Sequence, residues 1–534
     1  MYIARVPNRK SPPAILLRES YRENGKVKTR TIANLTQWAP ERIEALRKAL
    51  KGEFDGMDGQ EVSGEIFGAL FALKQLADQV GITRVLGPSE ERRLALFLVL
   101  ARIAHGGSRL SAVRWAEQHA VSDILGLDEF DENALYDALD WLEAQQIRIE
   151  KQLYEAYVKR MGEPPAIVLY DVTSSYFEGE HNELADYGYN RDGKKGKKQI
   201  VIGLLTGADG EPLAVRVFEG NTADPSTVGE QIELLKQQFG VSEVVFIGDR
   251  GMIKAKGKEA LEAQGWRYIS ALTKPQIRAL LKDDVLQPDL FDQDIAELQH
   301  EGKRLIVRRN ESVQRRERAR RADKLARLTV LVEERNTFVR QSTRADPGAG
   351  LRQLEHWVKR HRLHGFVSLS LEQDQIRCEI DQEKMTEVAL LDGCYVLETT
   401  VAAERMDAQT VDERYRDLQK VEHKFKAMKT NFLEVRPIFL RNAQRTKAHV
   451  FVAMLALKIT RLFDVLLHTA FGTTNDDPNA MTHEDALQSL GRLTYLIYDV
   501  KGSRYARLIQ PDEEQHALLA ALGIRFPRQT AKAL

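Results

Sequence analysis

Two stretches of the sequence decide the fold, 166-AIVLYD-171 and 244-VVFIGD-249. Each is a short, continuous apolar run that ends in an aspartate, which is typical of a buried strand in a sheet covered on both faces. Further strand-like runs lie at 197–206, 212–220 and 266–272, and a helical run lies at 226–240. Three strands in sequence, followed by helix, strand, helix and strand, predict a mixed α/β sheet with crossover helices.

The two aspartates that end these runs, Asp171 and Asp249, are candidate functional residues. In open α/β sheets, functional groups collect beyond the carboxyl ends of the strands. Two carboxylates held side by side repel each other unless they share a cation, and Mg²⁺ prefers hard oxygen ligands. For either aspartate alone, ordinary turn or cap chemistry is the more common explanation.

A third carboxylate, Glu422, lies in the helical stretch 412–429. At about 100° per residue, the apolar residues of this stretch form one stripe that faces a core: Leu418, Val421, Phe425 and Met428. Glu422 borders the stripe together with Tyr415, Lys426 and Lys429, so the carboxylate could point over the sheet edge while its neighbours hold a phosphate backbone. A plain i,i+4 pair between Glu422 and Lys426 is the alternative.

Composition excludes several classes of protein. The 534 residues are 43% hydrophobic and 29% charged, as expected for a folded chain of several domains. The 78 Lys and Arg balance 78 Asp and Glu, so nucleic-acid binding must depend on local clusters. The two cysteines build neither a disulfide framework nor a zinc cluster. No apolar run has signal-peptide or membrane-spanning length, so we expect a cytoplasmic protein without a membrane partner.

Local basic clusters supply candidate DNA contacts. One lies at 191–198 and another at 301–327, and the residues selected from them are Lys194, Lys195, Lys197, Lys198, Arg315 and Arg316. Such clusters neutralise phosphates, although a solvated helix face explains 301–327 equally well. Trp357 could stack on an unpaired base, whereas a place in a core is the more common role of a tryptophan.

Taken together, the motifs resemble the DDE transposases of bacterial insertion sequences. The resemblance is carried by LYDVTSSYFEG (169–179), FIGDRGM (246–252) and the spacing Tyr415-x2-Leu418-x3-Glu422-x6-Lys429. It is similar to the branch whose glutamate lies in a Tyr-Arg-Glu-Lys signature, and the phrases at 187–206, 220–228 and 441–457 agree with it. One position departs from the pattern, because Leu418 stands where the family has its arginine, so a phosphate contact there is in doubt.

This resemblance implies a ribonuclease H-like core in which Asp171, Asp249 and Glu422 hold two Mg²⁺ ions, with Mn²⁺ as a substitute, over a scissile phosphate. One ion would activate a water or a 3′-hydroxyl, and the other would stabilise the leaving oxygen. The substrates would be double-stranded DNA, namely the terminal inverted repeats and the target, bound by a homodimer at the nucleoid. Two alternatives stay open: a ribonuclease H-like nuclease that cleaves without joining, and an inactive DNA-binding relic.

The expected fold is a mixed-sheet core interrupted by an α+β insertion and preceded by a β-hairpin and a helical domain. An Asn-Gly turn predicts the hairpin at 14–34. Within the insertion, charged helices alternate with short strand candidates such as 327–334 and 366–372. The expected regions are 1–55 (hairpin), 56–163 (helical, DNA-binding), 164–275 (first half of the core), 276–390 (insertion), 391–472 (second half of the core) and 473–534 (C-terminal tail).

Overall fold

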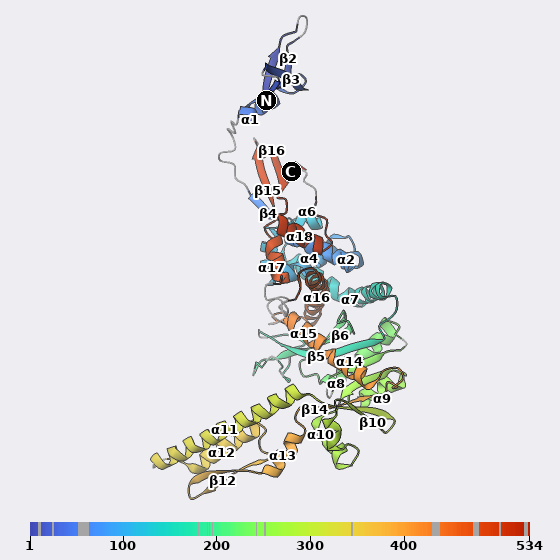
Figure 1. The fold of residues 1–534 in the computed structure, drawn as a ribbon, viewed down its shortest axis with the longest axis vertical. Helices are drawn as coiled ribbons and strands as arrows, with labels where there is room; N and C mark the ends of the chain where they lie inside the picture. Colours follow the sequence, from blue (N-terminus) through green and yellow to red (C-terminus); the bar gives the residue numbers. More distant parts are fainter. Residues whose placement is uncertain are drawn as a thin grey trace.

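The structure is a computed structural model. It describes residues 1–8, 12–23, 26–51, 63–179, 181–189, 191, 193–194, 196–241, 243–249, 252–342, 345–429, 438–473, 480–500, 503–527 and 532–533. The molecule is elongated, with the N-terminal strands at one end, the insertion at the other and the main sheet between them (Figure 1).

An eight-stranded mixed sheet forms the centre, in the order β10-β11-β14-β9-β8-β5-β6-β7. Its strands are β5 (Ile167–Tyr176), β6 (Gln199–Gly207), β7 (Pro212–Phe218), β8 (Val245–Gly248), β9 (Arg267–Ala271), β10 (Ala296–His300), β11 (Lys303–Arg309) and β14 (Cys394–Thr399). Strands β5, β6 and β7 form an antiparallel meander, β8 and β9 run parallel to β5, and β14 is antiparallel to β9. The predicted mixed α/β sheet is confirmed.

Helices cover both faces of this sheet. Successive residues of β5 point to opposite sides, as a strand requires. Val168 and Tyr170 pack in a core with one group of helices, whereas Leu169 packs in a core with the other. The first group is α8 (Asp224–Glu233), the π-helical turn η1 (Leu234–Gln238) and α9 (Ala255–Ala263). The second group is α14 (Ala408–Arg416), α15 (Leu418–Lys429) and α16 (Ala443–Phe471).

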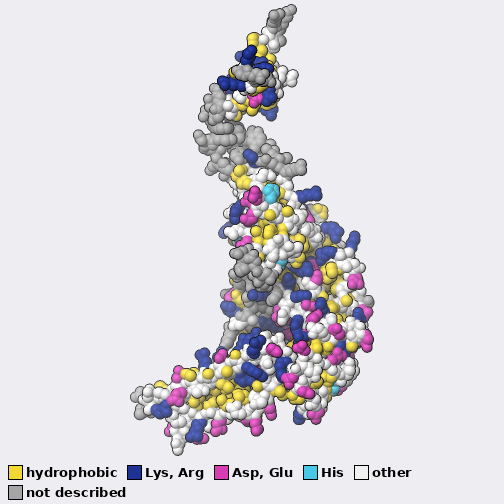
Figure 2. Space-filling model, viewed as in Figure 1, with side chains coloured by type: hydrophobic (Ala, Val, Ile, Leu, Met, Phe, Trp, Pro, Cys, Tyr) yellow, Lys and Arg dark blue, Asp and Glu magenta, His cyan; other side chains and the backbone are white. Residues whose placement is uncertain are grey.

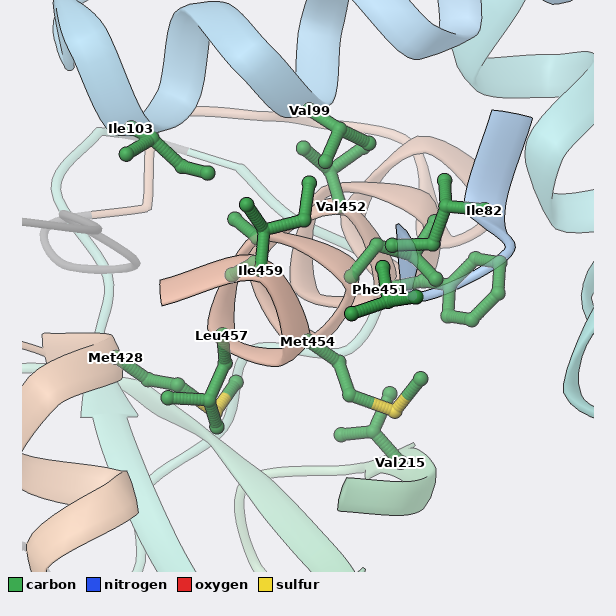
Figure 3. Close-up of a cluster of buried hydrophobic side chains, with 14 of the residues drawn as sticks. Ile82, Val99, Ile103, Val215, Met428, Phe451, Val452, Met454, Leu457 and Ile459 are labelled. Carbon is green, nitrogen blue, oxygen red and sulfur yellow. The ribbon is translucent and has the colours of Figure 1, made fainter. Parts of the chain in front are cut away.

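Helix α16 joins the sheet to the helical region, because it is buried on all sides over most of its length. Figure 3 shows Met454 pointing toward Val215 of β7, while Val452 lies on the opposite side of the helix, toward Val99 of α4 (Glu90–Ala104). One continuous hydrophobic core therefore runs from the sheet into the helical region.

The chain between β4 (Ser63–Ile66) and β5 is mostly helical, and the C-terminal tail packs onto it. Its helices are α2 (Gly68–Gln79), α3 (Ile82–Leu86), α4, α5 (Arg109–Ala116), α6 (Val121–Leu125) and α7 (Glu132–Met161). The tail contributes α17 (His483–Leu490), β15 (Thr494–Val500), β16 (Ser503–Leu508), α18 (Glu513–Ala521) and β17 (Lys532–Ala533). Strand β15 pairs with β4, so a four-stranded sheet closes between distant parts of the chain.

Helix length and composition give little sign of a membrane span. Among the described residues, no single helix is both long and apolar enough to cross a bilayer. In the same described part of the chain, α4 and α5 taken together reach that length and composition, and their axes differ by 94°.

The N-terminal hairpin is confirmed as β2 (Ala14–Glu23) and β3 (Lys26–Asn34), and its Asn24-Gly25 turn lies outside the described residues. A further strand, β1 (Tyr2–Val6), pairs with β2. Helix α1 (Pro40–Lys51) follows the strands.

The segment expected to form the insertion differs from the prediction in two ways. Strands β10 and β11 pair next to β14 and extend the main sheet. Residues 327–334, expected to be a strand, are helical, because Leu328 and Val332 recur at helical spacing and bury one side of a long helix. The other elements are α10 (Lys274–Lys282), η2 (Pro288–Asp292), α11 (Glu311–Gln341), α12 (Pro347–Arg360), β12 (Val367–Glu372), β13 (Gln375–Ile380) and α13 (Gln382–Leu390).

Candidate active site

Asp171 lies within β5 and Asp249 directly follows the neighbouring strand β8, and the pairing of these strands brings the two aspartates level with each other. The parallel pairing of β5 with β8 runs from Ile167 opposite Val245 to Tyr170 opposite Gly248, so the next residue on each strand is the aspartate. Strand β5 does not end at Asp171, as its sequence suggested, because it stays paired with β6 as far as Tyr176. We call the place where β8 ends, beside Asp171 of β5, the acidic edge.

The ionisation of Asp171 shows which charges surround it. Burial, together with the negative charges of Asp249 and Glu422, raises the pKa of Asp171 to about 7. The Val172 backbone N–H and the Arg191 guanidinium act in the opposite direction. Asp249 and Glu422 therefore both lie within electrostatic reach of Asp171, although the three carboxylates come from different parts of the chain.

Glu422 is exposed on α15, whose apolar stripe faces the core as predicted. Val421, Phe425 and Met428 are buried beside it, and Leu418 is only 6% exposed. Leu418, the position at which the resemblance suggested an arginine, is thus part of the hydrophobic core.

Tyr415 and Glu422 lie on separate helices, although the sequence suggested one continuous helix. Helix α14 ends at Arg416 and α15 begins at Leu418. Asp417, between them, forms ion pairs with Arg414 and Lys420 at 3.0 and 2.9 Å. The Tyr415 hydroxyl donates a 3.2 Å hydrogen bond to Oδ1 of Asp249, so α14 contacts the acidic edge directly.

Of the two lysines predicted on α15, the structure describes the side chain of one. Lys426 is exposed on the helix. The side chain of Lys429 lies outside the described residues.

An ionic network at the turn between β6 and β7, which the sequence did not reveal, supports α15. Lys420 donates a 3.1 Å hydrogen bond to the Ala208 carbonyl in the turn between β6 and β7. Lys424 is largely withdrawn from water, and this burial, together with the nearby Arg461 guanidinium, lowers its pKa. The helix that carries Glu422 therefore rests on this turn.

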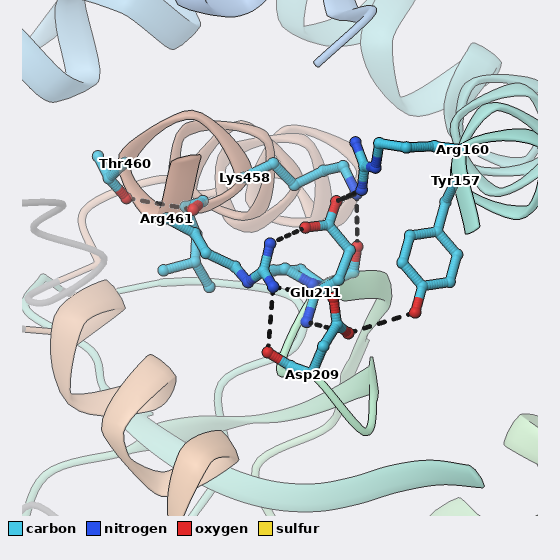
Figure 4. A network of polar contacts seen from close by, with 9 residues as sticks. Tyr157, Arg160, Asp209, Glu211, Lys458, Thr460 and Arg461 are labelled. Atoms are coloured by element: carbon cyan, nitrogen blue, oxygen red, sulfur yellow. Dashed lines mark hydrogen bonds and ion pairs between the residues drawn. The ribbon is translucent and has the colours of Figure 1, made fainter. Parts of the chain in front are cut away.

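The turn is itself held by α16. Glu211 and Lys458 form an ion pair in which each side chain is 4% exposed, and Arg461 bridges Glu211 and Asp209 (Figure 4). Burial alone would raise the pKa of Glu211, but Lys458 and Arg461 outweigh it and the pKa is lowered. The only signal in the sequence was a glutamate directly after a Gly-containing turn, which is too common to single out.

The donor set of the acidic edge suits a hard divalent cation, since it consists of carboxylates and a tyrosine hydroxyl. Within the part of the chain that the structure describes, however, no group of three or more His, Cys, Asp or Glu side chains could by itself hold a metal ion. Mg²⁺ commonly takes only one or two protein carboxylates and completes its shell with water and substrate phosphates. The residues therefore fit Mg²⁺ or Mn²⁺ bound together with a phosphate substrate.

The cluster at 191–198 lies beside the acidic edge. The Arg191 backbone N–H donates to Oγ of Ser174 on β5, at 2.9 Å. Lys194 lies 5.7 Å from the Tyr176 ring, and Lys197 pairs with Glu178 at 2.8 Å. Lys198 lies 5.8 Å from the centre of the Tyr187 ring, and Lys195 lies outside the described residues.

The other predicted DNA contacts belong to the insertion. Arg315 and Arg316 are exposed near the start of α11, where it leaves the main sheet. Figure 2 shows Lys and Arg side chains gathered where the insertion meets the core. Trp357 packs against the insertion's own hydrophobic core, and its ring lies 4.0 Å from that of His361, with the two planes tilted by 33°.

Acidic side chains at one edge of a mixed sheet, with cations beside them, define a candidate site for a phosphate substrate. The sequence matches the family described as "Transposase DDE domain" over residues 162–459 and "IS1634 family transposase, N-terminal domain" over residues 3–62. The first match covers more than half of the chain, which therefore belongs to the DDE transposases of insertion sequences.

Solved structures resemble the chain only distantly. One is the piggyBac transposase synaptic complex with hairpin DNA, at 9% identity and a TM-score of 0.34, covering 81% of this chain and 82% of that one. Another is the Mos1 transposase paired-end complex with the left transposon end, at 13% identity and a TM-score of 0.15, covering 34% and 59%. No curated protein sequence matches the chain.

Proposed function

We propose that this transposase cleaves DNA at the ends of its insertion sequence and joins those ends to target DNA, with Asp171, Asp249 and Glu422 as its catalytic acids. The observation that carries the proposal is the position of Asp171 and Asp249 directly after the paired residues of β5 and β8, with Glu422 near enough to oppose the ionisation of Asp171. Such clustered negative charge is costly unless a cation neutralises it, and it is typical of sites that bind divalent metals.

The proposed core is ribonuclease H-like. The support is topological: an antiparallel meander of β5, β6 and β7 is followed by β8 and β9, which add in parallel on the other side of β5. This order brings the first and fourth strands of the core together, and with them Asp171 and Asp249.

The roles of the chain's own residues follow from their positions. Asp171, Asp249 and Glu422 would hold one or two Mg²⁺ or Mn²⁺ ions, which when bound supply an activated oxygen nucleophile and stabilise the leaving oxygen. Tyr415 orients the Asp249 carboxylate through its hydrogen bond. Leu418 packs in the core and makes no phosphate contact.

The proposed substrates are the double-stranded terminal repeats of the element and the target DNA, and the proposed assembly is a homodimer that pairs two ends. The exposed Lys194 near the acidic edge, with Lys426 on α15 and Arg315 and Arg316 on α11, would neutralise backbone phosphates. Such a DNA substrate would place the protein at the nucleoid.

The test is an in vitro reaction on labelled DNA from the boundaries of the gene's own element, with Mg²⁺ or with EDTA. Wild type is compared with Asp249→Asn and with Asp283→Asn, which changes an exposed aspartate at the end of α10. Metal-dependent cleavage and joined products, both lost only in Asp249→Asn, are expected. Cleavage without joining would favour the nuclease, and DNA binding without cleavage under any metal would leave the inactive relic.

A further inference from the structure

Two tyrosine side chains in the segment between β5 and β6 are turned out into solvent. Tyr187 is 62% exposed and Tyr189 is 81% exposed. Aromatic rings this exposed bury little apolar surface in the fold, so they contribute little to its stability. Their position therefore calls for another explanation.

The backbone that carries these rings is firmly held. Asp186 and Gln199 exchange both backbone hydrogen bonds, at 3.1 and 2.9 Å, and the Asn221 side chain donates to the Asp186 carboxylate at 2.7 Å. Gly188, between the tyrosines, packs so closely that an added Cβ would lie 2.1 Å from the Gly220 carbonyl oxygen. With Gly188 held inward, the two flanking rings are presented on a fixed support.

Each ring has a cation beside it. The Lys198 ammonium lies 5.8 Å from the centre of the Tyr187 ring, and the Arg191 guanidinium lies 5.6 Å from that of Tyr189. Arg191 is anchored by an ion pair with Asp224 and by its backbone bond to Ser174. Ser174 follows Asp171 by three residues on β5, and the Arg191 charge acts on Asp171, so this support lies next to the acidic edge.

We propose that Tyr187 and Tyr189 form a stacking platform for unpaired bases of the DNA beside the reacting phosphate, an inference that rests on the proposed function. Rigid aromatic faces flanked by cations suit single-stranded DNA, because the rings stack on bases while the cations attract the backbone. A fully paired duplex hides the faces of its internal bases. The platform therefore favours DNA whose strands have separated at the element end.

The experiment measures DNA binding by fluorescence anisotropy with the full-length protein in EDTA, so that no cleavage intervenes. Two labelled DNAs carry the same element end, one fully paired and one with its terminal four nucleotides unpaired. The variants are Tyr187→Ala with Tyr189→Ala, and Tyr187→Phe with Tyr189→Phe. Phe338→Ala is the matched control, because Phe338 is 50% exposed with Arg335 over its ring but lies on α11 of the insertion.

The double alanine variant should bind the unpaired end about tenfold more weakly and the paired end almost unchanged. The phenylalanine variant and Phe338→Ala should bind both DNAs like wild type, because stacking needs the ring and not the hydroxyl. The proposal is overturned if the alanine variant keeps full affinity, if both DNAs lose affinity equally, or if the phenylalanine variant is equally weak. Since this assay needs no catalysis, loss of the proposed function in the cleavage assay would not change its result.

Discussion

Asp171 carries a large electrostatic cost at the scale of a single residue. Its carboxyl group is part-buried, and Asp249 and Glu422 add like charges nearby, so the folded protein favours the protonated form. A site selected only for stability would not keep such a group. A bound cation would remove this electrostatic cost, because it stabilises the carboxylate form of Asp171.

We predict that Asp171→Asn stabilises the protein in EDTA at pH 8, by a few kcal/mol at most. The raised pKa means that the folded protein holds this proton more tightly than the unfolded chain does. Wild type therefore loses stability as pH rises from about 4 to about 7, whereas the asparagine variant does not. Asparagine keeps an oxygen that can accept from the Val172 N–H.

Urea unfolding of both proteins between pH 5 and pH 8 measures this difference. The stability gap should be small at pH 5 and widest at pH 8, with Asp283→Asn indistinguishable from wild type throughout. An Asp171→Asn protein that is less stable than wild type at pH 8 would show that the carboxylate is not under electrostatic strain.

At the scale of single elements, α15 depends on a support that lies outside its own sequence. The turn between β6 and β7 receives Lys420 from α15, and its Glu211 pairs with Lys458 of α16. A buried ion pair of this kind adds little net stability, but it is costly to break, because the partner left behind keeps an uncompensated charge. The network thus fixes where the helix bearing Glu422 can lie.

Glu211→Gln should lower the free energy of unfolding by about 3–5 kcal/mol, because it leaves Lys458 buried and charged. Adding Lys458→Met should restore part of the loss, since the second change removes that charge. Asp346→Asn, which breaks the exposed pair with Arg352, should cost under about 1 kcal/mol. Thermal unfolding monitored by circular dichroism compares wild type with these three variants. A Glu211→Gln protein as stable as wild type would refute this role for the network.

At the scale of the whole molecule, the C-terminal tail belongs to the central body. Leu490 of α17 and Leu518 of α18 are fully buried in the core that continues through α16 to the sheet. The described residues of 1–51 contribute no member to that core. The C-terminal tail therefore contributes to the stability of the central core, whereas the described residues of 1–51 do not.

Removing residues 480–534 should lower the melting temperature of the protein by more than about 10 °C or prevent folding, because it uncovers several fully buried leucines. Removing residues 1–51 should shift it by less than about 2 °C. Differential scanning calorimetry of the two truncated proteins measures both shifts. Equal effects of the two truncations would contradict the single central core.

Local patterns predicted much of the fold, and long-range pairing accounts for what they missed. Burial requires apolar residues at a regular spacing along a strand or helix, and this spacing can be read directly from the sequence. The apolar runs before Asp171 and Asp249 and the stripe on α15 are examples. The addition of β10 and β11 to the main sheet and the pairing of β4 with β15 depend on partners about 90 and 430 residues away. The strand prediction for residues 327–334 was wrong because β-branched side chains favour strands, whereas helical packing of Leu328 and Val332 prevails.

Within the candidate site, strand and helix patterns together with the resemblance indicated the three carboxylates and Tyr415, whose catalytic roles stay predictions. These patterns could not indicate the break at Asp417, which separates Tyr415 from Glu422. They also could not indicate the support from Glu211 and Lys458, because a buried ion pair looks like surface charge in a sequence.

The most direct test of the central claim is the Mg²⁺-dependent cleavage rate of Glu422→Gln on DNA from the element's own end. The matched control is Glu413→Gln, an exposed glutamate on the neighbouring helix α14. If Glu422 acts with Asp171 and Asp249 as one metal site, its loss should slow cleavage by more than about 100-fold. This exceeds the effect expected for a residue that only hydrogen-bonds to a metal ligand. Glu413→Gln should cleave like wild type. Cleavage by Glu422→Gln at the wild-type rate would contradict the assignment of the third carboxylate.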